Sequence, residues 1–293
     1  ITEQELRDNF APYVRRMSDE LDLTSEKVLA EMARMYDGYH FVPNCPGLYN
    51  PFSVLNALDA QAFGSYWFAT GTPTYLVKLL RLHDYKLQSL SDEYVTEDIL
   101  NSIDVASTNP VPVIYQSGYL TIKDYDPEFR TYRLGFPNEE VEDGFFRFLL
   151  PFYTSVDRVE APFHIRKFVE EIRAGQPEAF LNRLKSFFAD TPYELVKNLE
   201  NHYQNVLYIL CKLLGLYVKA EYHTSAGRID LVLQTKDYTY VLEFKLDGTA
   251  EEALRQIQDK SYALPFETGE THVFRIGLNF SSETRNIGKW VMG

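Results

Sequence analysis

The spacing of hydrophobic residues changes between residues 200 and 246 of the chain. From Glu200 to Leu214 the apolar side chains recur three and four positions apart, which predicts a helix that ends at Gly215. Three short runs rich in β-branched and aromatic residues then predict strands; they span residues 216–223, 228–234 and 239–246. The polar pair Lys236-Asp237 between the last two runs indicates a turn.

Helical and strand patterns continue to alternate toward the C-terminus. Thr249 and Glu252 have the spacing of a capping box, which predicts a helix that runs to about Leu264. The stripe that this helix is expected to bury consists of Ala250, Ala253, Leu254 and Ile257. Residues 273–280 predict a fourth strand. The order helix, three strands, helix, strand indicates an α/β (α+β) domain over residues 196–293.

The first 110 residues have mostly helical spacing. Thr2 and Glu5 form a second capping-box pattern, and the hydrophobic spacing from Leu6 to Met17 predicts one helix. Two more helices are predicted to begin near capping candidates, which are Thr24 or Ser25 for the first and Asn50 or Ser53 for the second.

Residues 111–195 combine strand and helix signals. Strands are predicted over residues 113–115, 118–123 and 131–134, with a turn at 125–128 that makes a small hairpin. Helices are predicted to follow over residues 137–149, 163–174 and 178–188. We therefore expect three segments: a helical region at 1–110, a connector with a β-hairpin at 111–195, and the α/β domain at 196–293.

Composition and charge limit the possible functions. The 293 residues are 45% hydrophobic, which is enough for two modest domains with cores of their own. The net charge of −13 argues against unspecific binding to nucleic acid. The acidity is uneven, because residues 196–293 hold 11 basic and 12 acidic residues while the preceding 195 residues hold 18 and 30. The charge of the C-terminal domain therefore neither supports nor excludes a nucleic-acid substrate.

The sequence also indicates where the protein works. It has no apolar run as long as a membrane span and no signal-peptide pattern. Cys45 and Cys211 are far apart, without metal-ligand spacing, and are expected to be small buried hydrophobic residues. We expect a cytoplasmic protein with no membrane partner. Because the chain begins with Ile1 rather than Met, we expect a fragment of a longer protein.

Charged residues interrupt two of the predicted strands. Glu243 and Lys245 share one face of the last strand with Val241, and such charges are costly to bury unless they are paired or bound to a metal. Asp230 interrupts the preceding strand, so it can converge with Glu243 if the two strands are neighbours. Two carboxylates supply oxygens for a hard cation such as Mg²⁺. Such an ion can activate water against a phosphodiester, while Lys245 orients the nucleophile or stabilises the transition state.

This combination resembles the PD-(D/E)XK nuclease superfamily. The residues that carry the resemblance are Gly227-Arg-Ile-Asp230, then Glu243-Phe-Lys245 on a strand, then a helix with Gln256, Lys260 and Tyr262. The resemblance implies a restriction-endonuclease-like αβββαβ core with a mixed central sheet, Mg²⁺ or Mn²⁺ as cofactor, and nucleic acid as substrate. It also implies Asp230, Glu243 and the backbone carbonyl of Phe244 as metal ligands. The sequence departs from the superfamily pattern at Ile229, where a proline can occur in relatives. A second Asp-x-Lys match, Asp84-Tyr85-Lys86, has no strand pattern around it and is not a candidate.

Other polar residues are candidates for the same site. Glu200 is a candidate third catalytic acid beside Asp230, Glu243 and Lys245, or simply a favourable charge at a helix N-terminus. Gln204 lies one helical turn after Glu200. The remaining candidates contact substrate or support the site, with a solvated surface or an ion pair as the alternative; they are Glu221, Arg228, Gln256 and Lys260.

The N-terminal region carries a second resemblance. Its segments Tyr36-Asp-Gly-Tyr-His-Phe41, Leu48-Tyr-Asn-Pro-Phe-Ser53 and Tyr66-Trp-Phe-Ala-Thr-Gly71 are similar to the C-terminal part of AAA-ATPase-like proteins, which precedes a nuclease domain in many bacteria. The chain has no Gly-x-x-x-x-Gly-Lys-Ser/Thr pattern, so we expect no ATP site in it and an ATPase domain as partner in the longer protein. The aromatic residues of this region have helical spacing, which favours a core over a base-stacking surface.

Together these patterns predict a Mg²⁺-dependent nuclease that uses water as nucleophile, with DNA favoured over RNA. One alternative is a catalytically inactive nuclease-fold module that binds nucleic acid or protein. The other is a regulatory fragment whose helical half docks on ATPase and nuclease partners.

Overall fold

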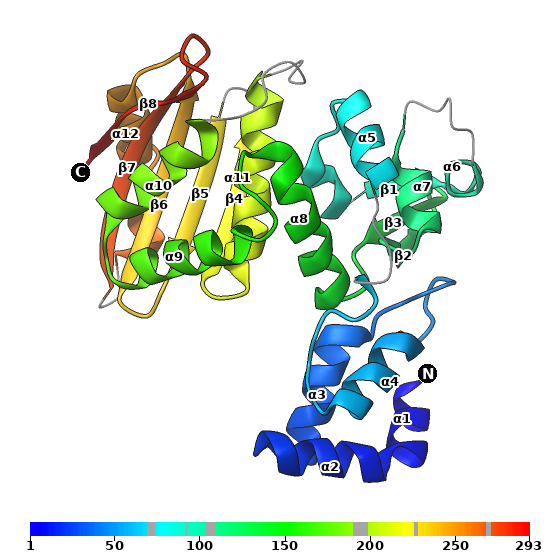
Figure 1. The fold of residues 1–293 in the computed structure, drawn as a ribbon. Coiled ribbons are helices and arrows are strands. Elements are labelled where there is room, and N and C mark those ends of the chain that lie inside the picture. The colour runs from blue at the N-terminus through cyan, green and yellow to red at the C-terminus, as the bar shows by residue number, and fades with distance from the viewer. Residues whose placement is uncertain (69–73, 92, 103–108, 190–198, 226–227, 268–270) are drawn as a thin grey trace. The chain divides into compact units, whose positions relative to one another are not determined.

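The computed structural model describes residues 1–68, 74–91, 93–102, 109–189, 199–225, 228–267 and 271–293 (Figure 1). The chain divides into two compact units, residues 1–145 and residues 146–293. None of the helices in the described ranges is both long and apolar enough to cross a membrane.

Unit 1 is a helical bundle followed by a small sheet. Its helices are α1 (Glu3–Asn9), α2 (Ala11–Leu21), α3 (Ser25–Tyr36), α4 (Pro51–Ala60), α5 (Thr74–Leu82), the 3₁₀ turn η2 (Leu87–Ser91), α6 (Glu97–Asn101) and α7 (Val111–Gln116). Its strands are β1 (Glu93–Thr96), β2 (Thr121–Asp126) and β3 (Thr131–Gly135), paired antiparallel in the order β1-β3-β2. Helix α8 (Glu139–Tyr153) begins in this unit and runs on into unit 2.

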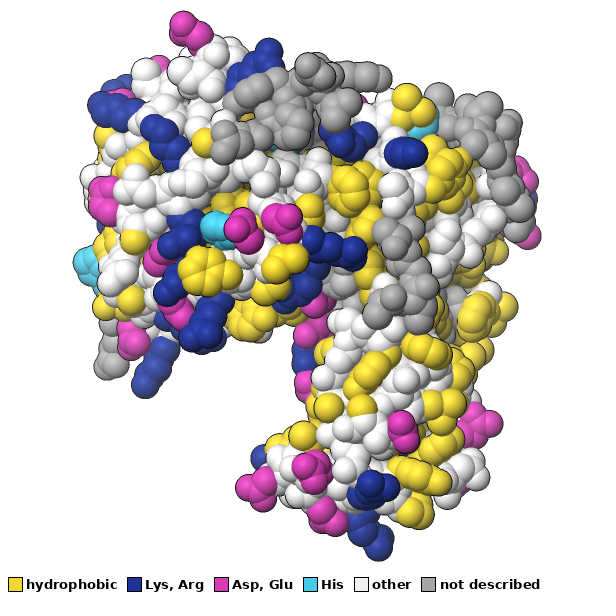
Figure 2. Space-filling model, viewed as in Figure 1, with side chains coloured by type: hydrophobic (Ala, Val, Ile, Leu, Met, Phe, Trp, Pro, Cys, Tyr) yellow, Lys and Arg dark blue, Asp and Glu magenta, His cyan; other side chains and the backbone are white. Residues whose placement is uncertain are grey.

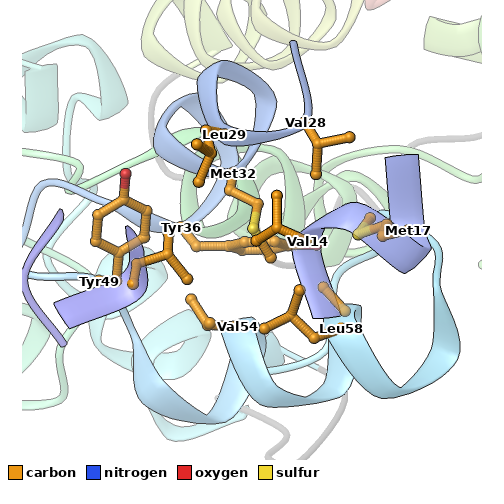
Figure 3. Packing of buried hydrophobic residues seen from close by; sticks show 11 residues of the cluster. Val14, Met17, Val28, Leu29, Met32, Tyr36, Tyr49, Val54 and Leu58 are labelled. Carbon is orange, nitrogen blue, oxygen red and sulfur yellow. The ribbon is translucent and has the colours of Figure 1, made fainter. Parts of the chain in front are cut away.

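Polar caps set the starts of the first helices, as the sequence predicts. Thr2 and Glu5 form both hydrogen bonds of a capping box at α1, and Thr24 caps α3. The Asn50 side chain accepts from the first backbone N–H groups of α4. Buried side chains from α1 to α4 then pack into one core around Met32 and Tyr36 (Figure 3).

Three predictions in unit 1 are wrong. The helix expected from Leu6 to Met17 is divided at Phe10, because Pro12 in the first turn of α2 starts a new helix. Residues 113–115, expected as a strand, lie in α7, where the Asn109 side chain accepts from the backbone N–H of Val111 and Pro112 occupies the first turn. Cys45, expected to be buried, is exposed. The predicted hairpin is present as β2 and β3, and β1 adds a third strand to it.

Unit 2 is a mixed sheet with helices on both faces. Its helices after α8 are α9 (Ala161–Arg173), α10 (Pro177–Ala189), α11 (Leu199–Gly215), α12 (Ala250–Asp259) and the 3₁₀ turn η4 (Leu264–Phe266). Its strands are β4 (Lys219–Ser225), β5 (Arg228–Gln234), β6 (Tyr238–Leu246), β7 (His272–Ser281) and β8 (Asn286–Met292), in spatial order β4-β5-β6-β7-β8. Strands β6 and β7 are parallel and the other pairs are antiparallel.

The parallel pair explains why α12 lies between β6 and β7 in the sequence, since parallel neighbours need a crossover connection. Ile257 of α12 packs on Val232 and Val241, so α12 covers that face of the sheet. On the opposite face Tyr240 meets Phe180 of α10, and Phe280 stacks on Tyr203 of α11. The mixed sheet between helices confirms the predicted fold class, β8 adds a strand that was not predicted, and α12 ends five residues earlier than expected, before η4.

Candidate functional site

The candidate site lies on β6. Side chains two residues apart share a face of a strand, so Glu243 and Lys245 lie on the same face as Val241, which is the face under α12. The Glu243 side chain is 0% exposed, and its Oε1 lies 3.3 Å from Nζ of Lys245, whose side chain is 21% exposed. The buried carboxylate therefore has an ammonium partner that reaches toward solvent.

Helix α12 fixes the position of Lys245. The Lys245 ammonium donates a hydrogen bond to Oε1 of Gln256 on this helix. The predicted capping box is formed, because Thr249 accepts from the Glu252 backbone and the Glu252 side chain accepts from the Thr249 backbone. The helix thereby begins five residues after Lys245 in the sequence, at Ala250, and presents Gln256 to it.

Gly277 allows α12 to approach the sheet, a feature that the sequence patterns did not reveal. It stands next to Glu243 in the parallel β6–β7 register. A Cβ atom on Gly277 would lie 2.2 Å from the carbonyl oxygen of Ala250 and 2.4 Å from the backbone nitrogen of Leu254. The backbone of α12 thus rests directly on β7 beside the buried carboxylate.

Strand β5 brings position 230 opposite the carboxylate. The antiparallel register pairs Asp230 with Glu243 on one side and with His223 of β4 on the other. Directly opposed positions of an antiparallel pair are the closest cross-strand neighbours in a sheet. The side chains of Arg228 and Asp230 lie outside the described part of the structure, so the backbone register is what places these two residues.

Glu200 and Gln204 form a polar pair on α11, with Nε2 of Gln204 donating to Oε1 of Glu200 over 3.2 Å. Tyr203, between them, packs on the sheet face opposite α12. The structure therefore brings Glu200 and Gln204 together. Their helix packs on one face of the sheet, and α12 with Gln256 packs on the other.

The other two candidates have surroundings of their own. Glu221 on β4 lies 3.0 Å from Nζ of Lys219 and 3.9 Å from Nε2 of His223. Lys260 is exposed at the C-cap of α12, one turn after Gln256. The structure thus assembles Glu243, Lys245 and Gln256 into one group, while the other candidates lie on α11, β4 and β5 and at the end of α12.

The start of α11 is more polar inside than the sequence patterns suggested. Three polar residues beside Gln204 are buried, namely Asn201, His202 and Asn205. The imidazole of His202 stacks on Tyr153, with ring centroids 6.2 Å apart. The polar run Glu200-Asn-His carries no local signal of this burial, because such residues are mostly exposed in proteins.

The donor atoms present are oxygens, which suit Mg²⁺ or Mn²⁺. Within the described ranges, no group of three or more His, Cys, Asp or Glu side chains could hold a metal ion. Mg²⁺ does not need such a group, since it is usually held by one or two carboxylates and keeps several waters. The Glu243 carboxylate is a donor of this kind.

Comparison with known proteins supports the assignment of the domain. Residues 198–290 match the PD-(D/E)XK nuclease superfamily. The chain is also 30% identical over 275 residues to an uncharacterized protein encoded in the vnfD 5′ region of Azotobacter chroococcum mcd 1. That match covers 89% of this chain and 52% of the relative, so the chain spans about half the length of the relative. No solved structure matches the chain. The sequence match and the helix-flanked mixed sheet together identify residues 198–290 as a domain of the PD-(D/E)XK nuclease superfamily.

Proposed function

We propose that unit 2 is a Mg²⁺-dependent nuclease that hydrolyses phosphodiester bonds with water as nucleophile. The observation that carries the proposal is the fully buried Glu243 carboxylate, 3.3 Å from the Lys245 ammonium and in register with Asp230. A structural role alone would favour apolar residues here, because replacing a buried ion pair by well-packed hydrophobic residues is often neutral or stabilising.

Each residue of the proposed site has a distinct task. Asp230, Glu243 and the carbonyl of Phe244 would hold Mg²⁺ or Mn²⁺. When bound, the ion supplies an activated water and neutralises charge on the phosphate. Lys245 would orient the water or stabilise charge in the transition state, and its hydrogen bond to Gln256 keeps the ammonium in place.

The surrounding candidates extend the site. Glu200, in the first turn of α11 and supported by Gln204, would act as a third acid. Arg228 and Lys260 would contact phosphates. Glu221 would take part after exchanging its ion pair with Lys219 for a contact to the site.

The charge of unit 2 leaves nucleic acid possible as its substrate, whereas that of unit 1 opposes it. Residues 146–293 hold 18 Lys and Arg and 19 Asp and Glu, whereas residues 1–145 hold 11 and 23. On the face of unit 2 drawn in Figure 2, basic side chains lie among acidic ones, so neither sign of charge dominates that face. We favour DNA over RNA as the substrate. We further propose that residues 1–110 follow an ATPase domain in the full-length protein, of the AAA-ATPase-like kind, and that this domain controls cleavage.

The proposal is tested by cleavage of end-labelled single- and double-stranded DNA and RNA with Mg²⁺ or Mn²⁺. The wild type is compared with Glu243→Gln, which removes the charge at nearly constant volume. Glu283→Gln, an exposed acid after β7, is the matched control. We expect metal-dependent cleavage by the wild type and the control, with a loss of about 100-fold or more in Glu243→Gln.

The same assay separates the alternative functions. A folded wild type that binds nucleic acid but leaves it intact with both metals would favour a binding module and overturn catalysis by this chain. Cleavage that survives in Glu243→Gln would place the active site elsewhere.

A further inference from the structure

Unit 1 contains a cavity that the proposed nuclease does not use. Its volume is about 610 Å³, within the usual range for small-molecule sites. Its walls come from three of the sequence segments noted above, residues 36–41, 48–53 and 66–71, together with the chain around α7 and β2. Residues 69–71 of the third segment lie outside the described residues. Residues as distant in the sequence as His40 and Thr121, which are 81 positions apart, therefore meet around one cavity.

The cavity is aromatic and contains few charges. Five of its lining residues are aromatic, namely Tyr39, Phe41, Tyr49, Trp67 and Tyr115. Apart from the imidazole of His40, the lining residues have no ionisable side chain other than the phenols. Such walls attract the faces of a flat, uncharged ring system and offer little to a phosphate group.

Hydrogen bonds hold these walls in place before any ligand arrives. The backbone of His40 is bonded on both sides to the Thr121 hydroxyl, with its N–H donating over 2.7 Å and its carbonyl accepting over 2.9 Å. The Tyr39 hydroxyl donates to the Gly118 carbonyl. The backbone N–H of Trp67 donates to the buried Glu140 carboxyl over 2.8 Å, and its ring packs edge-on against Tyr119. Preformed walls lower the entropy lost on binding.

The polar groups at the cavity suit the edge of a heterocycle. Gln116 donates through its amide nitrogen to the Leu100 carbonyl over 2.8 Å, which orients its carbonyl oxygen as an acceptor. The exposed hydroxyl of Ser117 follows it in the lining and can donate or accept. A ring that stacks on the aromatic residues and carries its own donors and acceptors would meet both groups.

We infer that this cavity binds a nucleobase, with its ring between the aromatic residues and its polar edge at Gln116 and Ser117. The base can come from a free nucleoside or nucleotide or from an unpaired position in a nucleic acid. The net charge of −12 on residues 1–145 opposes a polyanion, so the free nucleoside is the ligand that fits best. The inference does not depend on the proposed nuclease activity.

Trp67 provides a direct measurement, because the chain has two tryptophans. In the variant Trp290→Phe, which alters a residue of β8 in unit 2, Trp67 remains as the reporter. Adenosine, AMP, ribose 5-phosphate and a short adenine-rich oligonucleotide are titrated in EDTA, so that no cleavage occurs. We expect a saturable change of Trp67 fluorescence with adenosine and AMP and none with ribose 5-phosphate.

Two variants test the location of the site. Ser117→Phe fills the cavity from an exposed position, and Ser282→Phe makes the same change at an exposed position of unit 2. We expect Ser117→Phe to weaken adenosine binding about tenfold or more and Ser282→Phe to leave it unchanged. Gln116→Leu nearly keeps the side-chain size and should weaken adenosine binding by loss of the amide. This variant replaces Ser117→Phe in the test if Ser117→Phe fails to fold.

The titrations also distinguish the sources of the base. Equal or tighter binding of adenosine than of the oligonucleotide would assign the cavity to a free nucleoside or nucleotide, whereas a response to the oligonucleotide alone would assign it to an unpaired base. No response to any base-containing probe, or the same response in Ser117→Phe as in the parent, would overturn the inference.

Discussion

Each unit of the protein buries a glutamate completely, and the two carboxyl groups have different kinds of partner. Glu243 of unit 2 is 0% exposed and lies 3.3 Å from an ammonium group. Glu140 of unit 1 is also 0% exposed, but its carboxyl accepts from the Ser53 hydroxyl over 2.6 Å and from the backbone N–H of Trp67 over 2.8 Å. One carboxyl is thus held by a charge and the other by neutral donors.

The pKa of the unit 1 carboxyl follows from this difference. Burial raises the pKa of Glu140 above its ordinary value, and the hydrogen bonds from Ser53, Trp67 and Tyr66 offset only part of that rise. Glu140 is therefore protonated more readily than an exposed glutamate. Its carboxyl group links α8 to Ser53 of α4 and to the backbone at Trp67. An ammonium beside a carboxylate favours the charged form, which a metal ligand requires. Burial alone therefore does not mark a catalytic acid, and the cation beside Glu243 is what makes it the candidate.

The largest effect is expected from removal of the ammonium in Lys245→Met. Activity should fall about 100-fold or more in the cleavage assay, because the charge beside the reacting phosphate is lost. Stability should also fall, by up to about 3 kcal/mol in urea unfolding, because a buried carboxylate is left without its cation; the partial exposure of Lys245 limits this cost.

The double variant Glu243→Gln with Lys245→Met separates these two effects. It should recover most of the stability and none of the activity, since both charges are gone. Equal instability of the single and the double variant would mean that the ion pair is not what balances Glu243.

The next largest effect concerns the contact between α12 and the sheet. Gly277→Ala places a methyl group 2.2 Å from the Ala250 carbonyl oxygen, so α12 must move away from β7 and carry Gln256 away from Lys245. We expect a loss of about 1–3 kcal/mol in unfolding free energy and a lower cleavage rate. Gly215→Ala is the control, because its Cβ would meet no atom within 4 Å. Wild-type activity in Gly277→Ala would show that Gln256 does not position the ammonium.

Several of these features can be read in the sequence and others cannot. The period-two alternation of Val241, Glu243 and Lys245 places both charges on one face without any knowledge of the fold, and the capping box predicts where α12 begins. Burial of Glu140 cannot be read in this way, because Ser53 and Trp67 lie 87 and 73 positions away in the sequence. Long-range partners decide whether a polar residue is buried, and local patterns do not contain them.

The same distinction explains the incorrect predictions. Residues 113–115 are Val-Ile-Tyr, which favour a strand by propensity, but Asn109 and Pro112 at the start of α7 favour a helix turn. Strand β8 carries Gly288 and Lys289 in its middle and lacks a clear alternation, so its pairing with β7 supplies the order that its own sequence lacks. For Asp230, the run from Arg228 to Gln234 correctly predicts a strand, and the register supplies its partner; its role remains a prediction.

A smaller effect, with a clear sign, is expected from pH in unit 1. The folded pKa of Glu140 lies above its unfolded value, so the group contributes stability that is fully present below the unfolded pKa and is lost as pH rises through the folded pKa. Glu140→Gln cannot ionise and should therefore gain stability relative to the wild type as pH rises from the ordinary glutamate pKa of about 4.3 toward neutral, by about 1.4 kcal/mol for each unit of pKa difference.

This dependence is measured by urea unfolding of wild type and variant across that range. Glu128→Gln, at an exposed position in the turn after β2, is the matched control and should show a constant difference from the wild type. A difference between Glu140→Gln and the wild type that does not change with pH would mean that Glu140 is ionised in the folded protein, as Glu243 is proposed to be.

The smallest effect compares the two capping boxes, which have the same chemistry in the two units. Thr2→Ala and Thr249→Ala each remove the side-chain acceptor at the start of a helix, and each should cost about 1 kcal/mol in unfolding free energy. Only Thr249→Ala should also lower the cleavage rate, because α12 carries the Gln256 amide that holds the Lys245 ammonium, whereas α1 has no part in the proposed catalysis. Measuring both quantities for both variants separates a general loss of stability from a loss of positioning, since the first would lower activity equally in the pair and the second would not.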